Sequence, residues 1–100
     1  MSTSALIKVE GVDYAELYKH WDGYPEATLE WLEHFNEDFT KNRGNDPEYK
    51  FAQLVRSSIR EADYFNLDNN PYTGWGVVEP ESWDCDFLYV LNKDGSVTIK

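Results

Sequence analysis

Hydrophobic residues recur with a helical period in the middle of the chain and alternate with polar residues towards both ends. A first helix is predicted to begin near Pro25, because the first turn of a helix does not need the N–H that proline lacks. With about 3.6 residues per turn, its apolar arc holds Thr28, Trp31, Leu32, Phe35 and Phe39. This arc is expected to face the core, and the opposite side of the helix to face solvent.

A second helix is predicted after a polar loop at residues 42–45. Asp46 precedes Pro47, which combines a capping residue with a proline at the first helical position. The apolar arc of this helix holds Phe51, Leu54, Val55, Ser58, Ala62 and Phe65, and the opposite side holds Gln53, Arg56 and Arg60. The second helix is therefore expected to present basic residues to solvent.

Short runs with alternating polarity or β-branched residues predict strands over residues 6–10, 15–21, 75–78, 84–91 and 96–100. Turn residues between the first two runs and between the last two predict a hairpin at each end of the chain. The order β-β-α-α-β-β-β places strands at both ends and helices in the middle. We expect an α+β fold, a single domain over residues 1–100, in which two helices cover one face of an antiparallel sheet.

The composition supports a folded chain and limits its partners. Of 100 residues, 41% are hydrophobic and 16% aromatic, which is enough apolar mass for one core. Asp and Glu number 19 against 9 Lys and Arg, and the formal net charge is -10. This is the wrong sign for direct binding to nucleic acid or to an anionic membrane, so a charged partner should be basic.

Cysteine usage and the start of the chain indicate the compartment. Cys85 is the single cysteine, so no internal disulfide can form, and a reducing compartment is indicated. The first residues show no basic segment followed by a long apolar run, so we expect neither a signal peptide nor a membrane span. The chain is therefore expected to be cytoplasmic. His20, His34 and Cys85 do not have the spacing of metal ligands, and we expect no metal and no cofactor.

The most distinctive segment of the chain is the turn between the second strand and the first helix, residues 18–25. Its candidate ligand-binding residues are Tyr18, His20, Trp21, Asp22, Gly23 and Tyr24. In a functional interpretation, His20 titrates near neutrality beside Asp22 and forms a binding or catalytic site. In a structural interpretation, Gly23 supplies a positive φ, Asp22 caps the helix that Pro25 begins, and the aromatic side chains pack. The structural interpretation is favoured, because a motif without known geometry is only a hypothesis.

The same segment resembles the Tyr-Arg/Lys-His-Trp-Asp-Gly-Tyr-Pro hallmark of a family of short proteins found mostly in phages, prophages and bacterial genomes. The resemblance continues in residues 46–49, which open the second helix, and in residues 86–90 of the acidic and aromatic strand near the end. It implies a mobile-element setting, with the host cytoplasm as the place of action, and it implies no reaction.

Carboxylates line the predicted solvent side of the first helix. Four of these carboxylates are candidate residues for partner binding: Glu26, Glu30, Glu33 and Glu37. Trp75, in a later strand, is a fifth candidate. A solvated face is the simplest explanation, and a docking surface for a basic protein groove is the alternative. Mimicry of DNA by one helix is disfavoured, because its carboxylates are spaced roughly 4 to 6 Å apart against about 1.7 Å per charge in a duplex. Two copies in a homodimer would come closer to the required density.

These observations favour a non-enzymatic, phage-type accessory protein that binds and inhibits or modulates a host protein. Defence or nucleic-acid-handling machinery is the favoured target class, and the hypothesis rests on the small size, the acidity, the resemblance and the lack of a catalytic signature in the sequence. An alternative is a small-ligand-binding or hydrolytic domain with its site at His20, Asp22 and Tyr24, which a deep pocket at that turn would support. A third hypothesis is an oligomerisation module, which would show a large apolar interface.

Overall fold

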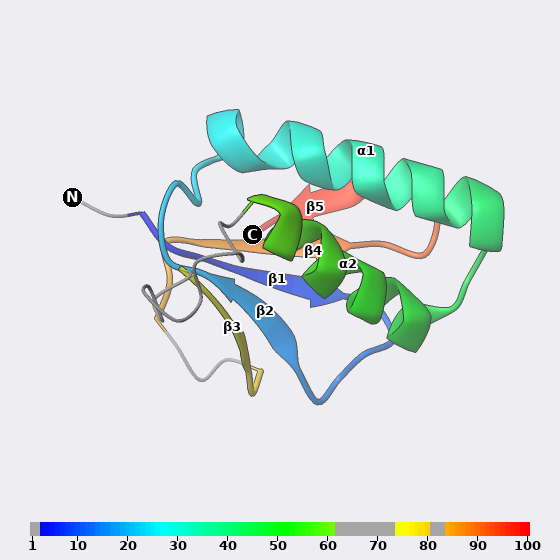
Figure 1. Cartoon of the computed structure of the whole chain (residues 1–100), viewed down its shortest axis with the longest axis horizontal. Coiled ribbons are helices and arrows are strands. Elements are labelled where there is room, and N and C mark those ends of the chain that lie inside the picture. Colours follow the sequence, from blue (N-terminus) through cyan, green and yellow to red (C-terminus); the bar gives the residue numbers. More distant parts are fainter. Residues whose placement is uncertain (1–2, 62–73, 81–83) are drawn as a thin grey trace.

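The computed structural model describes residues 3–61, 74–80 and 84–100 (Figure 1). Its elements follow the predicted order: β1 (Ala5–Val9), β2 (Glu16–Lys19), α1 (Pro25–Arg43), α2 (Pro47–Glu61), β3 (Trp75–Val78), β4 (Phe87–Leu91) and β5 (Val97–Ile99). The α+β class is confirmed. Ala62 and Phe65, which were expected on the apolar arc of the second helix, lie outside the described residues.

The strands form one five-stranded sheet with the spatial order β3-β2-β1-β4-β5. Three neighbouring pairs are antiparallel, but β1 and β4 run parallel, with Ile7 opposite Tyr89. The expectation of a fully antiparallel sheet is therefore wrong at its centre. A short turn forces its two strands to be antiparallel, whereas β1 and β4 are far apart in sequence and joined through both helices, so no local signal fixes their direction.

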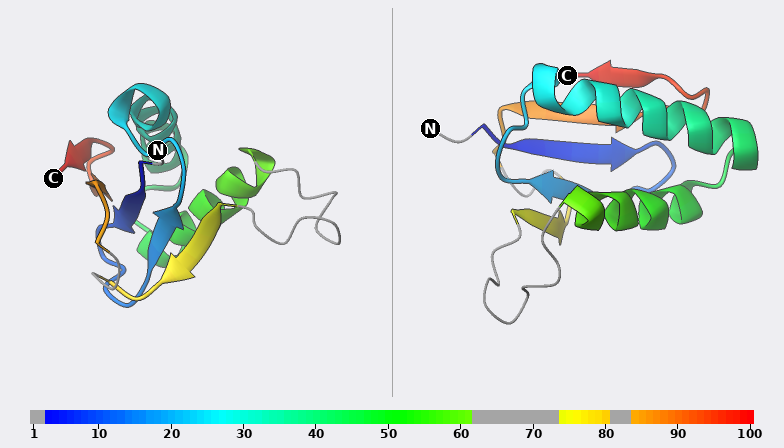
Figure 2. Two further views of the ribbon diagram at one scale, coloured as in Figure 1. Left: turned by 90° about the vertical axis from the view of Figure 1, so that its left-hand side faces the viewer. Right: turned by 45° about the horizontal axis from the view of Figure 1, so that its top comes forward.

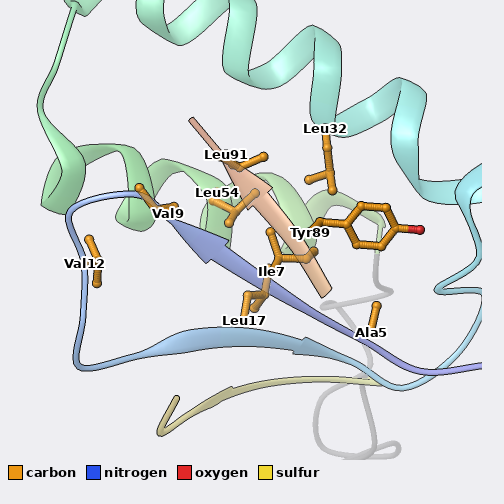
Figure 3. Packing of buried hydrophobic residues seen from close by; sticks show 9 residues of the cluster. All are labelled: Ala5, Ile7, Val9, Val12, Leu17, Leu32, Leu54, Tyr89 and Leu91. Carbon is orange, nitrogen blue, oxygen red and sulfur yellow. The ribbon is translucent and has the colours of Figure 1, made fainter. Parts of the chain in front are cut away.

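Both helices lie on one face of the sheet, as expected (Figure 2). Alternate residues of the central strands point towards them, which follows from the two-residue period of a strand. Figure 3 shows these side chains meeting one residue from each helix. The fully buried cluster consists of Ala5, Ile7, Val9, Val12, Leu17, Leu32, Leu54, Tyr89 and Leu91. Leu32 and Leu54 occupy the arcs that the helical period predicts.

A buried amide fixes α1 to the turn between β4 and β5. Asn36 is fully buried, and its Nδ2 donates to the carbonyl of Asn92 at 3.0 Å and to that of Ser96 at 2.8 Å. Its Oδ1 has no hydrogen-bond partner. Buried polar groups specify a unique arrangement when they are paired, so these two bonds set how far α1 can slide along the sheet.

Lys50 of α2 reaches the same turn. It is only 2% exposed, and its ammonium lies 3.4 Å from the carbonyl oxygen of Asn92 and 3.5 Å from Oγ1 of Thr40. Burial lowers the pKa of Lys50, although the negative charges of Glu10 and Asp94 act in the opposite direction. The fold therefore disfavours the charged form of this side chain relative to the unfolded chain.

Replacing Lys50 by Met is expected to raise the free energy of unfolding at pH 7, and the gain should shrink as pH rises. A lowered pKa in the folded state means that the unfolded chain binds more protons between the folded pKa and the model value of 10.5, so wild-type stability rises with pH across that window. Urea unfolding of both proteins at neutral and alkaline pH measures the difference. Contributions from tyrosines cancel in this comparison, and a gain independent of pH would contradict the assignment.

Candidate functional site: the motif turn and the acidic face of α1

The motif turn, residues 18–25, is held to the sheet through its main chain. The N–H of Gly23 donates to the carbonyl of Thr3 at 2.8 Å, and the carbonyl of Gly23 accepts the hydroxyl of Tyr89 at 2.6 Å. The hydroxyl of Thr28 donates to the carbonyl of Asp22 at 2.8 Å. These three bonds join the end of β2, the start of α1 and the core strand β4, so the turn has an architectural function.

Gly23 is needed for space rather than for an unusual backbone angle. The expectation that it has a positive φ is wrong, because the residue with a left-handed conformation is Asp22, at φ 55. A Cβ on Gly23 would lie 2.8 Å from the Cβ of Ala5 and 2.8 Å from the carbonyl carbon of Ser4. The turn therefore passes so close to the start of β1 that only a residue without a side chain fits.

Asp22 does not cap α1, which corrects a second expectation. The N-cap position belongs to Tyr24, with φ -71 and ψ 155, and no side chain there forms a cap hydrogen bond. Pro25 opens the helix as expected. Asp22 instead supplies a backbone conformation that Asp tolerates better than most residues, and this places its carbonyl in line with the hydroxyl of Thr28.

His20 pairs with a tyrosine rather than with the expected carboxylate. Its Nδ1 lies 2.6 Å from the hydroxyl oxygen of Tyr18, and its ring meets the ring of Trp21 edge-on at 4.7 Å. No hydrogen bond joins His20 to Asp22 in the described part of the chain. Burial raises the pKa of Tyr18, which favours its neutral form as the partner of the imidazole. The acid-base pair required by the catalytic interpretation is therefore not formed.

Two aromatic side chains of the turn stay open to solvent. Trp21 is 47% exposed and Tyr24 is 38% exposed. The inner side of the Trp21 ring packs on Gly74, where an added Cβ would come within 2.6 Å of the ring. The turn thus exposes two aromatic side chains, and packing on Gly74 holds the ring of Trp21 in place.

The four candidate carboxylates of α1, Glu26, Glu30, Glu33 and Glu37, form a continuous exposed row, which we call the acidic stripe. Within the residues that the structure describes, Glu26, Glu33 and Glu37 make no ion pair. Glu30 pairs with His34 at 3.9 Å, and both side chains are more than three-quarters exposed, at 87% and 80%. Such an exposed pair contributes little to stability.

Asp94, which sequence reasoning did not select, extends the acidic stripe onto the turn between β4 and β5. Together with Glu37, Thr40, Lys41 and Gly95 it lines a shallow hollow of about 430 Å³. Hydrogen bonds from the hydroxyl and the N–H of Ser96 lower the pKa of Asp94, so its negative charge is maintained to lower pH. The sequence indicates the turn itself, but only the packing of α1 on the sheet brings it beside Glu37.

Trp75 does not join the acidic stripe. Its ring meets that of Trp31 edge-on at 5.6 Å, and the ammonium of Lys19 lies 4.5 Å from its centre. At about 100° per residue, Trp31 and Glu33 leave α1 roughly 160° apart, so Trp75 lies on the other side of this helix. Trp75 packs at the edge of the core, and this favours the structural interpretation of its role.

Among residues 3–61, 74–80 and 84–100, no group of three or more His, Cys, Asp or Glu side chains converges on a metal site. In the same ranges no helix combines the length and apolarity that crossing a bilayer requires. Comparisons with protein-family models, with curated proteins and with solved structures each found no match for the chain. The resemblance to the phage-type family therefore stays a prediction.

Replacing Gly23 by Ala is expected to lower the free energy of unfolding by about 1–3 kcal/mol, because the added methyl must displace main-chain atoms of β1. Gly76 provides the matched control: a Cβ there meets nothing within 4 Å, and Gly76→Ala should change stability by less than about 0.5 kcal/mol. Urea unfolding monitored by tryptophan fluorescence measures both. Equal effects of the two variants would contradict the steric assignment.

A substitution series at Asp22 separates backbone conformation from capping. If the left-handed φ is what matters, Asp22→Gly should raise stability by about 0.5–1 kcal/mol, Asp22→Asn should be neutral and Asp22→Ala should lose about 1 kcal/mol. A capping role would instead make Gly slightly worse than Asp. Whether Asp22→Gly raises or lowers the free energy of unfolding therefore decides between the conformational role and the capping role.

Proposed function

We propose that this chain is a non-catalytic binding protein whose acidic stripe docks on a basic surface of a protein partner. The favoured partners are host defence or nucleic-acid-handling proteins, which the bound chain would inhibit or modulate. The observation that carries the proposal is that most of the carboxylates of the stripe have no counter-ion within the described chain.

The charges of the stripe stand on a rigid support. Leu32 and Asn36 anchor α1 from the opposite side, so the main chain that carries the stripe is held in place. From Glu26 to Glu37 the row extends about 16 Å along the helix axis. With a formal net charge of -10 behind it, this face attracts basic surfaces over several ångströms at low salt and accelerates encounter.

The acidic stripe does not stabilise the fold, which also favours a role in binding. Like charges three or four residues apart cost a helix a few tenths of a kcal/mol per pair. None of the three unpaired glutamates gains a compensating bond within the described residues. Solvation alone can account for exposed charges, so the proposal needs a test on association rather than on folding.

The alternative, a hydrolytic or ligand-binding site at His20, Asp22 and Tyr24, receives less support. General acid-base catalysis needs a base within hydrogen-bond reach of its orienting group. Here His20 is bound by the hydroxyl of Tyr18, and the main chain around Asp22 serves to hold the turn.

Changing Glu30, Glu33 and Glu37 together to Gln is expected to slow association with the partner at low salt by tenfold or more. The side chains keep their size and helix propensity, but three negative charges are lost and the salt dependence of the on-rate should flatten. Thermal stability should stay level or rise, because like-charge repulsion is relieved. The partner is first identified by capture from bacterial lysate with quantitative mass spectrometry, and on-rates are then measured at two salt concentrations.

A control variant loses three negative charges elsewhere. It combines Asp13→Asn, Glu48→Gln and Asp84→Asn, and all three residues are exposed and lie outside α1. The proposal requires this control to bind faster and with a steeper salt dependence than the stripe variant. Equal on-rates and equal salt slopes in the two variants would show that only net charge matters and that the acidic stripe is merely solvated.

A further inference from the structure

One edge of the sheet, the strand β5, is open to a further strand. In the spatial order β3-β2-β1-β4-β5 it has a single neighbour, β4. Its residues Val97, Thr98 and Ile99 include no proline and no charged side chain, two features with which proteins block an edge strand. Such an edge offers main-chain donors and acceptors to which an extended segment can pair.

The hydrogen bonds to β4 show which main-chain groups of β5 face outwards. Lys100 exchanges two bonds with Leu88, of 2.8 and 3.4 Å. In an antiparallel pair only every second residue faces its neighbour in this way, so Thr98 also faces β4, and Val97 and Ile99 face the open side. Within the described part of the chain, the N–H and C=O groups of Val97 and Ile99 have no hydrogen-bond partner.

The helix α1 runs alongside this edge. Asn36 donates to the carbonyl of Ser96 directly before β5. Ile99 near the end of β5 is paired with Tyr89, whose hydroxyl donates to Gly23 directly before α1 begins. β5 therefore runs back along α1, from the second half of the helix towards its start.

The acidic stripe leaves α1 on the flank that faces the β5 edge. Trp31 marks the other flank, because its indole N–H donates to Ser57 of α2 at 2.8 Å. Glu33 leaves the helix roughly 160° away from Trp31, and Glu37 lies against the turn that leads into β5. Figure 2 shows α1 on the β5 side of the sheet and α2 on the β3 side. The carboxylates therefore point over the space that a strand added to β5 would enter.

An added strand would present alternate side chains to the stripe. Ile99 is paired with the core residue Tyr89, so the side chains of Val97 and Ile99 lie on the helix face of the sheet. Residues opposite them in an added antiparallel strand share that face and direct their own N–H and C=O groups to β5. Their side chains would follow one another at about 6.5 Å, against about 4.5 to 6 Å between successive carboxylates of the stripe.

We propose that β5 accepts an extended basic segment of the partner as a sixth strand, with Lys or Arg at every second position facing the acidic stripe. This proposal rests on the binding function proposed for the stripe and adds the form in which the partner is recognised. A second copy of this chain is disfavoured as the occupant, because pairing of two β5 strands would bring two acidic stripes together. Lys100 does not compete for the stripe, since it alternates with Ile99 and lies on the face away from the helices.

The test uses the folded, 15N-labelled chain and the peptide acetyl-Lys-Val-Arg-Val-Lys-amide, followed by 1H-15N NMR. At saturation we expect the amides of Val97 and Ile99 to exchange with solvent at least tenfold more slowly, because each gains an acceptor. The amide of Thr98, which already faces β4, should change little. Absence of binding, or binding without protection of Val97 and Ile99, would overturn the proposal.

Two N-methylated peptides with the same side chains and charge separate strand addition from simple attraction of charges. Methylation of the main-chain nitrogen of the central Arg removes a donor that faces β5, whereas methylation of the Val that follows it alters a nitrogen that faces solvent. The first peptide should bind at least tenfold more weakly than the second. Equal affinities would show that no strand is added.

Variants of the edge leave the charges of the stripe in place. Ile99→Pro removes an outward N–H, which an edge strand tolerates, and Ile99→Ala keeps it. Ile99→Pro should bind the peptide at least tenfold more weakly than Ile99→Ala, and equal binding would contradict strand addition. If Ile99→Pro does not fold, the two methylated peptides decide alone. Sedimentation that shows the peptide-free chain dimerising through β5, with Ile99→Pro monomeric, would instead identify a second copy as the occupant.

Binding of the captured partner distinguishes this proposal from the docking function. A partner that binds Ile99→Pro and Ile99→Ala equally, but binds the variant of Glu30, Glu33 and Glu37 more slowly than its charge-matched control, refutes strand addition and supports docking. A stripe variant that binds like its control refutes docking, whatever the edge variants do.

Discussion

The hydrogen bond from the hydroxyl of Tyr89 to the carbonyl of Gly23 is the interaction on which the arrangement of the two layers depends. Tyr89 is fully buried in the central strand β4, and Gly23 is the residue at which the chain passes from the sheet to α1. Burial raises the pKa of Tyr89, so the hydroxyl keeps the proton that it donates. The bond is possible only because Gly23 lies against the main chain at the start of β1. This contact holds the start of α1 against the central strand of the sheet.

Local sequence signals predict the elements of this fold well and their pairing less well. Pro25 and Pro47 mark the helix starts, and the helical period selects Leu32 and Leu54 as core residues, because each signal depends on neighbours a few positions away. The parallel pairing of β1 with β4 has no such signal, since the two strands are far apart in the sequence. A sequence pattern can therefore predict where the strands lie without predicting their order and direction in the sheet.

The candidate sites show the same division. The exposure of the acidic stripe is predictable from helix geometry alone, but the addition of Asp94 requires the turn after β4 to meet α1. At the motif turn the sequence identifies the right residues but not their roles. The left-handed conformation expected at Gly23 belongs to Asp22, and Gly23 instead allows the close approach to β1. The burial of Glu16, which is only 2% exposed in β2, leaves no trace in the sequence, because a glutamate in a short strand is normally a solvent-facing residue.

Several cations of the chain are held by aromatic rings. The guanidinium of Arg43 lies 3.8 Å from the ring centre of Tyr49, and the ammonium of Lys19 lies 4.5 Å from that of Trp75. Arg43 is the last residue of α1, and Lys19 lies in β2 beside β3. Positive charge therefore also stands at the C-terminal end of the acidic stripe, where Lys41 lines a hollow with Glu37 and Asp94.

The exposed and the buried carboxylates of this chain differ in how strongly solvent and salt screen their charge. Charges in water act over about 10 Å at moderate ionic strength and are weakened by salt, so Glu30, Glu33 and Glu37 can guide a basic partner without choosing its chemical groups. A buried carboxylate such as Glu16 is screened much less by added salt, because little solvent reaches it. The two kinds of charge lie on opposite layers of the fold (Figure 2), and added salt weakens the field of the acidic stripe much more than that of Glu16.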